Sequence, residues 1–415
     1  QINEGPRVFV ERIDITGNVR SIDKIIRREM KLVEGDAYST AKLRQSRKNI
    51  QDLNFFESVS IERIPGSAAD KTSVKIDVEE KSTGSLSLGI GYSTDTGPMG
   101  DIGIRERNLM GRGQDLALNM RLATESSQID LSFTEPYFLD RKLSAGFDIF
   151  KKTEDNQDES SFDSSQLGGS LRMGYPLTEY LHQNWEYLYS IRDVTNVGSD
   201  ASIFVQAQSG EQTTSKISHY LRYDRRNSRL LPTKGYYAAL INELAGLGGT
   251  SHFMRNTVKG SYHHSFTDNI IASVSGKTGV IVGLGEDVEL LDRFFIGGSD
   301  LRGFAISGVG PRDTSTDDAL GGEWMYTGTF ELKVPVGLPD ELGVSGRLFT
   351  DFGSSGKLTD SSTSVEDAQS LRASVGAGIT WISPLGPIGV DFGFPVLEET
   401  YDITESVRIN LGTQF

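Results

Sequence analysis

From residue 84 onward, hydrophobic and polar residues alternate one by one in short runs. The run 86–92 and the run 407–411 are examples from the two ends of this region. A period of two residues predicts β-strands whose side chains point alternately to two faces. Alternation and flanking turn residues together indicate about sixteen strands in all, including one over 142–150 and the next over 166–175.

The first 81 residues follow a different pattern, which predicts an α+β domain. Ser21 is a candidate N-cap for a helix with apolar residues on one face, and Ser39 is a candidate N-cap for a second helix. One extended segment precedes the helices and ends at Gly17. Two alternating segments, joined by the turn 65–67, follow them. The expected order is β-α-α-β-β.

The connections between the predicted strands alternate in length. Short ones such as 108–112 and 266–269 are interleaved with longer polar ones such as 193–212. Short turns on one side and long loops on the other are typical of outer-membrane barrels. We therefore expect a 16-stranded antiparallel transmembrane β-barrel over 82–415. An even number of strands places the N-terminal domain and the end of the barrel on the short-turn side, and makes 282–321 the sixth external loop.

Composition agrees with a barrel and excludes some function classes. The chain of 415 residues has 46 Gly and only 12 Pro, and its 20 Phe and 14 Tyr fall in short alternating runs. It has no Cys, which removes disulfide frameworks and Cys-based zinc sites. A net charge of −15 argues against a nucleic-acid partner.

No pattern in the chain predicts catalysis, a cofactor or a metal site. His263 and His264 are adjacent, so on a strand they face opposite sides. The acidic stretch 313–318 is better explained as a solvated external loop than as a calcium site. The chain also lacks a nucleophile elbow and a phosphate-binding loop in a βα unit. We therefore expect a protein that is not an enzyme.

One short segment of the sixth loop is chemically unusual. Leu301, Arg302, Gly303 and Phe304 place one arginine between apolar residues in a glycine-rich stretch. If the loop folds into the barrel, the guanidinium is costly unless carboxylates pair with it. Alternation places Glu331 and Asp351 on the lumen face of later strands.

The residues named so far carry a family resemblance that covers the whole chain. The segment 293–304 resembles the signature of the BamA family of outer-membrane barrel-assembly proteins, usually written (V/I)RGF, with Leu301 as a mild departure. Residues 381–387 resemble that family's turn before the last two strands, and residues 1–81 resemble its POTRA domain nearest the barrel. The resemblance implies an inward-folded sixth loop, with Glu331 and Asp351 as partners of Arg302.

Closure of the barrel must pair the first strand with the last, and this seam is a second candidate site. The residues concerned are Gly84, Leu86, Leu88, Gly89 and Gly91 in the first strand, and Val407, Ile409, Leu411, Gly412 and Phe415 in the last. Glycine weakens a strand, and a weak seam would expose backbone edges that template another strand. From the residues alone, the glycines could equally relieve crowding in a curved wall. The resemblance implies a lateral gate.

The function implied by the resemblance is assembly and insertion of β-barrel proteins into the bacterial outer membrane through this seam, without ATP or cofactor. The implied partners are unfolded outer-membrane protein clients, accessory lipoproteins and outer-membrane lipid, with the POTRA domain in the periplasm. The exposed strand edge near Val59–Ile64 would receive clients or lipoproteins, or the domain would serve as a spacer with a hinge at 81–83. A TamA-like assembly factor and a two-partner secretion pore that exports one passenger protein are the alternatives.

Overall fold

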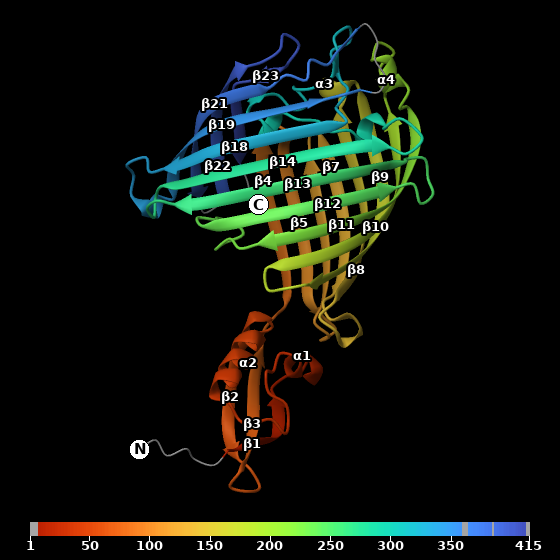
Figure 1. The fold of residues 1–415 in the computed structure, drawn as a ribbon. Coiled ribbons are helices and arrows are strands. Elements are labelled where there is room, and N and C mark those ends of the chain that lie inside the picture. Colours follow the sequence, from red (N-terminus) through yellow and green to blue (C-terminus); the bar gives the residue numbers. More distant parts are fainter. Residues whose placement is uncertain (1–6, 359–363, 384–385, 412–415) are drawn as a thin grey trace. The chain divides into compact units, whose positions relative to one another are not determined.

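The computed structural model describes residues 7–358, 364–383 and 386–411. The chain forms an α+β domain followed by a β-barrel (Figure 1). The first domain contains β1 (Phe9–Thr16), α1 (Asp23–Arg27), α2 (Thr40–Asp52), β2 (Phe56–Pro65) and β3 (Lys71–Glu80). The order β-α-α-β-β is the predicted one. No helix among the described residues is long and apolar enough to cross a membrane.

The sheet of the first domain has the strand order β1-β3-β2. Strand β3 pairs in parallel with β1 and antiparallel with β2, so β2 lies at an edge. The helices bury their apolar faces against the sheet, where Ile25, Ile50 and Ile76 are among the fully buried core residues. This burial supplies the main favourable contribution to the stability of the domain.

One predicted helix cap is present and the other is wrong. Ser39 is the N-cap of α2, and its side chain accepts a hydrogen bond from the Lys42 amide at 3.4 Å. Helix α1 starts two residues after Ser21, without a side-chain cap. The Ser21 amide instead donates to Glu80 Oε1 at 2.6 Å, because a carboxylate on β3 reaches the turn before the helix.

The barrel is closed and has sixteen antiparallel strands, which confirms the predicted fold class. In chain order the strands are β4 (Gly84–Ser93), β5 (Gly97–Leu109), β6 (Gln114–Ala123), β7 (Ser126–Glu135), β8 (Ser144–Asn156), β9 (Phe162–Pro176), β10 (Leu181–Thr195), β11 (Gly210–Asp224), β12 (Gly235–Ala245), β13 (Phe253–Ser265), β14 (Ile271–Gly283), β18 (Trp324–Val334), β19 (Val344–Gly356), β21 (Arg372–Ser383), β22 (Gly386–Leu397) and β24 (Val407–Leu411). Large apolar side chains such as Leu348 and Phe352 are exposed on the outer face, as expected for a surface in contact with lipid.

Several strands are longer than predicted from alternation. Strand β8 continues to Asn156 and β9 begins at Phe162, so most of the segment between the predicted strands is paired as well. The outer face of this extension is polar, and hydrophobic alternation therefore ends before the backbone ladder does. The connections 94–96 and 124–125 are also short, so the predicted difference in loop length does not hold at every position.

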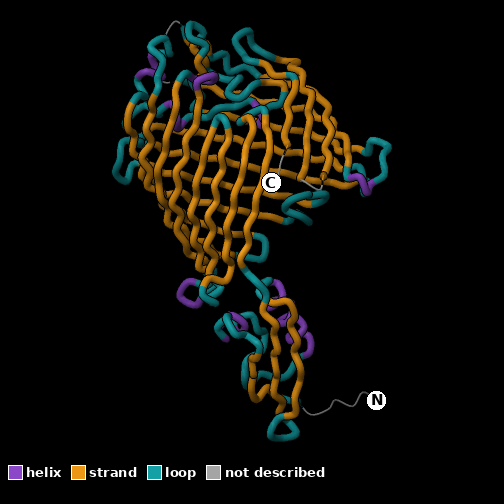
Figure 2. Tube along the Cα trace, turned by 180° about the vertical axis from the view of Figure 1, so that it is seen from behind, coloured by secondary structure: helices purple, strands orange, loops and turns teal. Residues whose placement is uncertain are grey.

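Most of the irregular structure lies at one mouth of the barrel (Figure 2). The sixth loop, residues 284–323, connects β14 to β18 and carries the short strands β15 (Gly303–Phe304), β16 (Arg312–Asp313) and β17 (Asp318–Ala319). Strand β15 pairs with β23 (Thr404–Glu405), and β16 pairs with both β17 and β20 (Val365–Glu366). The sixth loop also contains the 3-10 turns η2 (Leu290–Asp292) and η3 (Gly298–Asp300). Other connections contain the helices α3 (Gln157–Ser160) and α4 (Ile203–Gln206) and the 3-10 turns η1 (Phe138–Asp140) and η4 (Asp340–Leu342).

Candidate functional site: the sixth loop and the barrel seam

The four-residue motif of the sixth loop is buried. Leu301 and Phe304 are fully buried and pack in an apolar cluster with other residues of the loop and with Met325 of β18. Gly303 and Phe304 pair with Glu405 and Thr404, which come just before the last strand. The loop is therefore fixed both to the barrel wall and to the segment that leads into β24.

Arg302 lies against both carboxylates named from the sequence. Its Nε and Nη2 donate to Asp351 Oδ2 and Oδ1 at 2.7 and 2.9 Å, a bidentate pair, and its Nη1 donates to Glu331 Oε2 at 3.0 Å. The Arg302 amide adds a bond to Asp351 Oδ2 at 3.1 Å. Asp351 is fully buried, so its charge is compensated by Arg302 and not by water.

Further residues of the barrel wall complete what we call the arginine cluster. The guanidinium of Arg302 lies over the ring of Phe349, 3.5 Å from its centroid, in a cation–π arrangement. Its Nη1 is 3.9 Å from Asp391 Oδ2, and Asp391 Oδ1 lies 2.8 Å from Nε of Arg347. Strands β18, β19 and β22 thus all hold the loop.

The charge of Arg302 is favoured by its surroundings. Burial disfavours the charged guanidinium, but the hydrogen bonds with Asp351 and the nearby charges of Asp351, Glu331 and Asp391 outweigh burial and raise the pKa of Arg302. An arginine in this environment stays charged throughout the physiological pH range. It serves as a permanent attachment point and not as a proton donor or acceptor.

Two glycines allow the loop to approach the wall closely. Gly303 has φ +97°, a left-handed conformation that favours glycine. Gly393 of β22 faces it, and a Cβ atom there would lie 2.7 Å from the Gly303 nitrogen. The Ser374 hydroxyl donates to the carbonyl oxygen of Arg302, so the backbone of the motif is bound from this side as well.

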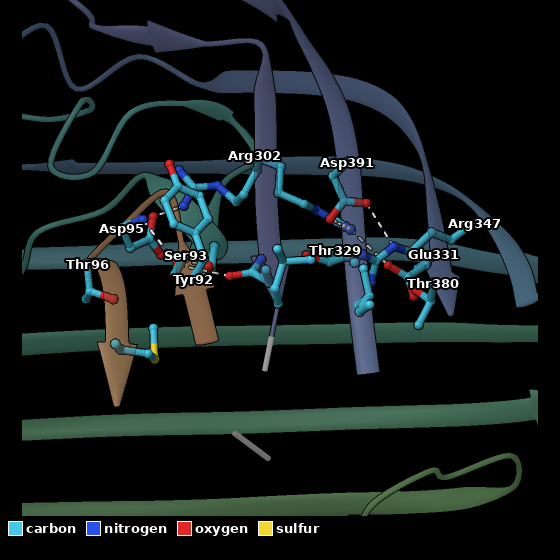
Figure 3. Close-up of a pocket in the computed structure, with 17 residues that line it drawn as sticks. Tyr92, Ser93, Asp95, Thr96, Arg302, Thr329, Glu331, Arg347, Thr380 and Asp391 are labelled. Atoms are coloured by element: carbon cyan, nitrogen blue, oxygen red, sulfur yellow. Dashed lines mark hydrogen bonds and ion pairs between the residues drawn. The ribbon is translucent and has the colours of Figure 1, made fainter. Parts of the chain in front are cut away.

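A polar cavity of about 610 Å³ separates the arginine cluster from the first strand (Figure 3). Arg302, Glu331, Arg347 and Asp391 line one part of it. Another part is lined by Tyr92 and Ser93 of the first strand, by Asp95 in the connection after it, and by Arg408, Asn410 and Leu411 of the last strand. The inner face of the seam therefore borders a cavity that the sixth loop also lines, through Ser299 and Arg302.

The seam itself has few described backbone pairs. Leu411 pairs with Tyr92 and Asn410 with Ser93, and the Thr94 amide donates to the Ile409 carbonyl at 3.1 Å. Within the described part of the chain, these two residue pairs are the whole ladder between β24 and β4.

The other residues predicted for the seam are not paired across it in the described part of the chain. Gly412 and Phe415 lie outside the described residues. Val407 pairs with Phe392 of β22 and Ile409 with Val390, on the side of β24 away from the first strand. In β4, Leu86 and Leu88 are largely exposed, and none of Gly84, Gly89 or Gly91 is paired with a described residue of β24. Among the described residues, the structure therefore brings together only the loop ends of the two strands.

Side chains reinforce the described end of the seam. Arg408 of β24 is buried and forms ion pairs with Asp95, in the connection after β4, and with Glu405. Ser299 of the sixth loop donates to the other carboxylate oxygen of Asp95 at 3.2 Å. We call Asp95, Arg408 and Ser299 the junction, because they join the first strand, the last strand and the sixth loop.

The segment before the last strand is held separately. Arg372, which is fully buried at the start of β21, donates to both carboxylate oxygens of Asp402 at 2.9 and 3.1 Å. Its Nη2 also donates to the Tyr401 hydroxyl at 2.9 Å. The chain is thus fixed up to residue 405, directly before β24.

Inspection of the sequence did not identify several of these residues. Asp391 lies between Val390 and Phe392, in the same apolar-acid-apolar pattern that identified Glu331, so alternation could have found it. The roles of Phe349, Asp95 and Arg408 depend on register and on the path of the loop. No local sequence signal indicates either.

Two family models match the chain. The model of the Omp85 superfamily domain matches residues 108–415. The chain belongs to the Omp85 superfamily. A second model, POTRA, described as a surface antigen variable number repeat, matches residues 8–81. The chain is therefore a POTRA-plus-barrel protein of the BamA type, as the sequence motifs indicated.

Curated relatives of the chain are assembly proteins by name. The outer membrane protein assembly factor BamA of Neorickettsia risticii is 33% identical over 410 residues, which span 98% of this chain and 55% of that protein. BamA of Nitratidesulfovibrio vulgaris is 31% identical over 96% of this chain and 50% of its own length. This chain thus spans about half the length of these relatives. The human sorting and assembly machinery component 50 homolog is 26% identical over 100% of this chain and 92% of its own length.

Solved structures agree on the fold. The crystal structure of BamA from Haemophilus ducreyi lacking POTRA domains 1–3 superposes with a TM-score of 0.88 at 24% identity, and covers 100% of this chain and 86% of that one. CdiB from Escherichia coli has a TM-score of 0.63 at 14% identity over 99% of this chain and 77% of its own. The relatives and the barrel together indicate an outer-membrane location.

Proposed function

We propose that this protein assembles other β-barrel proteins in the bacterial outer membrane, using the seam between β4 and β24 as a template for client strands. Strand addition at a sheet edge requires neither a chemical reaction nor ATP, because new backbone hydrogen bonds replace old ones. The proposed activity is therefore not enzymatic. Its clients would be unfolded outer-membrane proteins.

The position of the seam carries this proposal, because the described ends of β4 and β24 meet beside the cavity that the fixed sixth loop lines. Opening this end of the seam would break the two described backbone pairs and the Arg408–Asp95 ion pair, and each adds to the free-energy cost of opening. The exposed edges would then be free to pair with a client strand. The other ladders would stay intact and keep the barrel closed elsewhere.

The sixth loop would provide the fixed side of this opening. The arginine cluster ties the loop to three wall strands, while β15 and the Arg372–Asp402 pair hold the chain before β24. The movable part would begin after Glu405. The junction would close the seam at its loop end until a client competes for the edge.

Membrane orientation and accessory partners belong to the same proposal. The POTRA domain would lie in the periplasm, where the unpaired edge of β2 offers a second site of strand addition for clients or for lipoproteins. The outer face of the barrel would contact outer-membrane lipid through its exposed apolar side chains.

Depletion of the full-length protein in its native cells, followed by quantitative proteomics of the outer membrane, tests this function. We expect a parallel fall in many unrelated barrels, because a general template does not depend on one client sequence. Loss of one secreted protein with the other barrels unchanged would contradict the proposal and indicate a dedicated export pore.

A further inference from the structure

Three tyrosines and one arginine form a compact patch on the outer face of the barrel, at the short-turn ends of β10, β11 and β12. The rings of Tyr223 and Tyr236 stack with centroids 5.6 Å apart and an interplanar angle of 21°. Tyr180 lies beside them, with its ring centroid 6.4 Å from that of Tyr223. The guanidinium of Arg225 lies 4.7 Å above the ring of Tyr180.

Strand register places this patch on the outer face. Tyr223 pairs with Leu181 and Ala238, and it is an even number of residues from Ile217, whose side chain is exposed on the outside. Lys216, the neighbour of Ile217, points to the lumen, where it pairs with Glu243. Residues of one strand that are an even number apart share a face.

Arg225 and its neighbour Arg226 differ in how their charges are compensated. Arg226 binds both carboxylate oxygens of Asp224 at 3.0 and 2.9 Å and lies over the ring of Tyr237. Arg225 has no carboxylate within 4.0 Å among the described residues, and its guanidinium interacts with tyrosines instead. Its exposed guanidinium therefore has an unmatched positive charge.

The backbone holds this arginine in place. Its amide donates to the Tyr236 carbonyl at 2.9 Å, and the Asp224 amide donates to the Tyr180 carbonyl at 3.0 Å. The turn that follows is closed by Asn227, whose side-chain oxygen accepts from the amides of Thr233 and Lys234 at 3.0 Å each. These hydrogen bonds fix the backbone of the patch without a bound ligand.

We propose that Arg225, on its platform of Tyr180, Tyr223 and Tyr236, binds the headgroup phosphate of an anionic phospholipid at the short-turn face of the membrane. A guanidinium matches phosphate oxygens in a two-point contact, and tyrosines favour the membrane interface because their rings are apolar and their hydroxyls polar. The inference rests on the proposed membrane setting, but not on the assembly of clients.

Lipid retention by the purified full-length protein tests this proposal. Phosphatidylglycerol and phosphatidylcholine are titrated separately into the detergent-solubilised protein, and bound lipid is counted by native mass spectrometry. We expect Arg225→Gln to weaken phosphatidylglycerol binding about fivefold, since one basic residue near the surface contributes about that factor. Phosphatidylcholine binding should change less, and heat-modifiable gel migration verifies that each variant is folded.

Arg141 supplies a matched control. It is exposed in another short turn, between β7 and β8, and no ring contact to it is present in the described residues. Arg141→Gln should retain phosphatidylglycerol as the wild type does, and Tyr180→Leu should weaken retention while leaving the charge in place. Unchanged retention in Arg225→Gln, or an equal loss in Arg141→Gln, would overturn the proposal.

Free glycerol phosphate distinguishes a lipid site from a site for small phosphates. At the same concentration it should displace little bound phosphatidylglycerol, because the acyl chains place the lipid beside the apolar wall. Equal displacement would overturn the assignment to lipid. This experiment measures lipid binding alone, whereas the depletion experiment measures the assembly function. The lipid proposal can therefore fail while the assembly proposal stands, and the reverse also holds.

Discussion

Arg302 shows how a buried charge can hold a loop in place. A bidentate pair with Asp351 and a further bond to Glu331 compensate the desolvation of three charged groups. The loop and the wall contribute opposite charges, so neither side is satisfied without the other. The pairing therefore specifies where the loop binds as well as contributing to how tightly it binds.

Arg302→Ala is expected to destabilise the barrel by about 3 kcal/mol or more, because it leaves the buried Asp351 carboxylate unpaired. Urea denaturation or the temperature of gel-shift unfolding measures the change. Arg121→Ala is the matched control. Its pair with Asp101 is partly exposed, so the loss should stay below about 1 kcal/mol. Equal losses in the two variants would mean that Arg302 has no special role.

Gly393→Ala tests the close approach between the loop and β22. The added methyl would meet the backbone of Gly303 at 2.7 Å, and overpacking of this kind costs about 1–3 kcal/mol. Thermal unfolding of the folded barrel measures the loss. Gly260→Ala serves as the control, since the nearest atom to its Cβ is 3.6 Å away. If Gly393→Ala is as stable as Gly260→Ala, the loop does not lie against this strand.

At the scale of elements, the last strand depends on the junction as much as on its own ladder. Asp95→Asn is expected to increase opening of the seam about tenfold, because a hydrogen bond to a charged group contributes about 1.5 kcal/mol or more. Hydrogen exchange of peptides that contain Thr94 and β24 reports this opening.

Asp101→Asn is the control for that experiment. It removes a carboxylate of β5 whose partner, Arg121, is more exposed than Arg408. It should leave the exchange of β24 unchanged. Similar exchange in wild type and Asp95→Asn would show that the junction does not restrain the seam.

The regular elements were more predictable from sequence than the loops. Lipid on one face of each strand enforces alternation, and alternation was enough to count sixteen strands and to place Glu331 and Asp351 toward the lumen. Their contact with Arg302 required the family motif, since nothing local specifies where a 40-residue loop binds. Asp95 and Arg408 are more than 300 residues apart, and only closure of the barrel brings them together.

At the scale of the whole molecule, the firmly held sixth loop lies beside the described end of the seam. The two features share one cavity, and the chain just before β24 belongs to the firmly held part. A client strand could therefore displace β24 from β4 without loosening the remaining wall. This arrangement is the physical basis of the proposed assembly function.

The most direct measurement is client insertion by a barrel with a locked seam. The chain has no cysteine, so Ser93→Cys with Asn410→Cys places one disulfide across a described pair of the seam. Ser190→Cys with Thr214→Cys provides the control across the ladder between β10 and β11. The full-length protein, reconstituted with its accessory partners, should lose client insertion when the seam is oxidised and regain it on reduction, while the control stays active. Full activity with the seam locked would contradict the account.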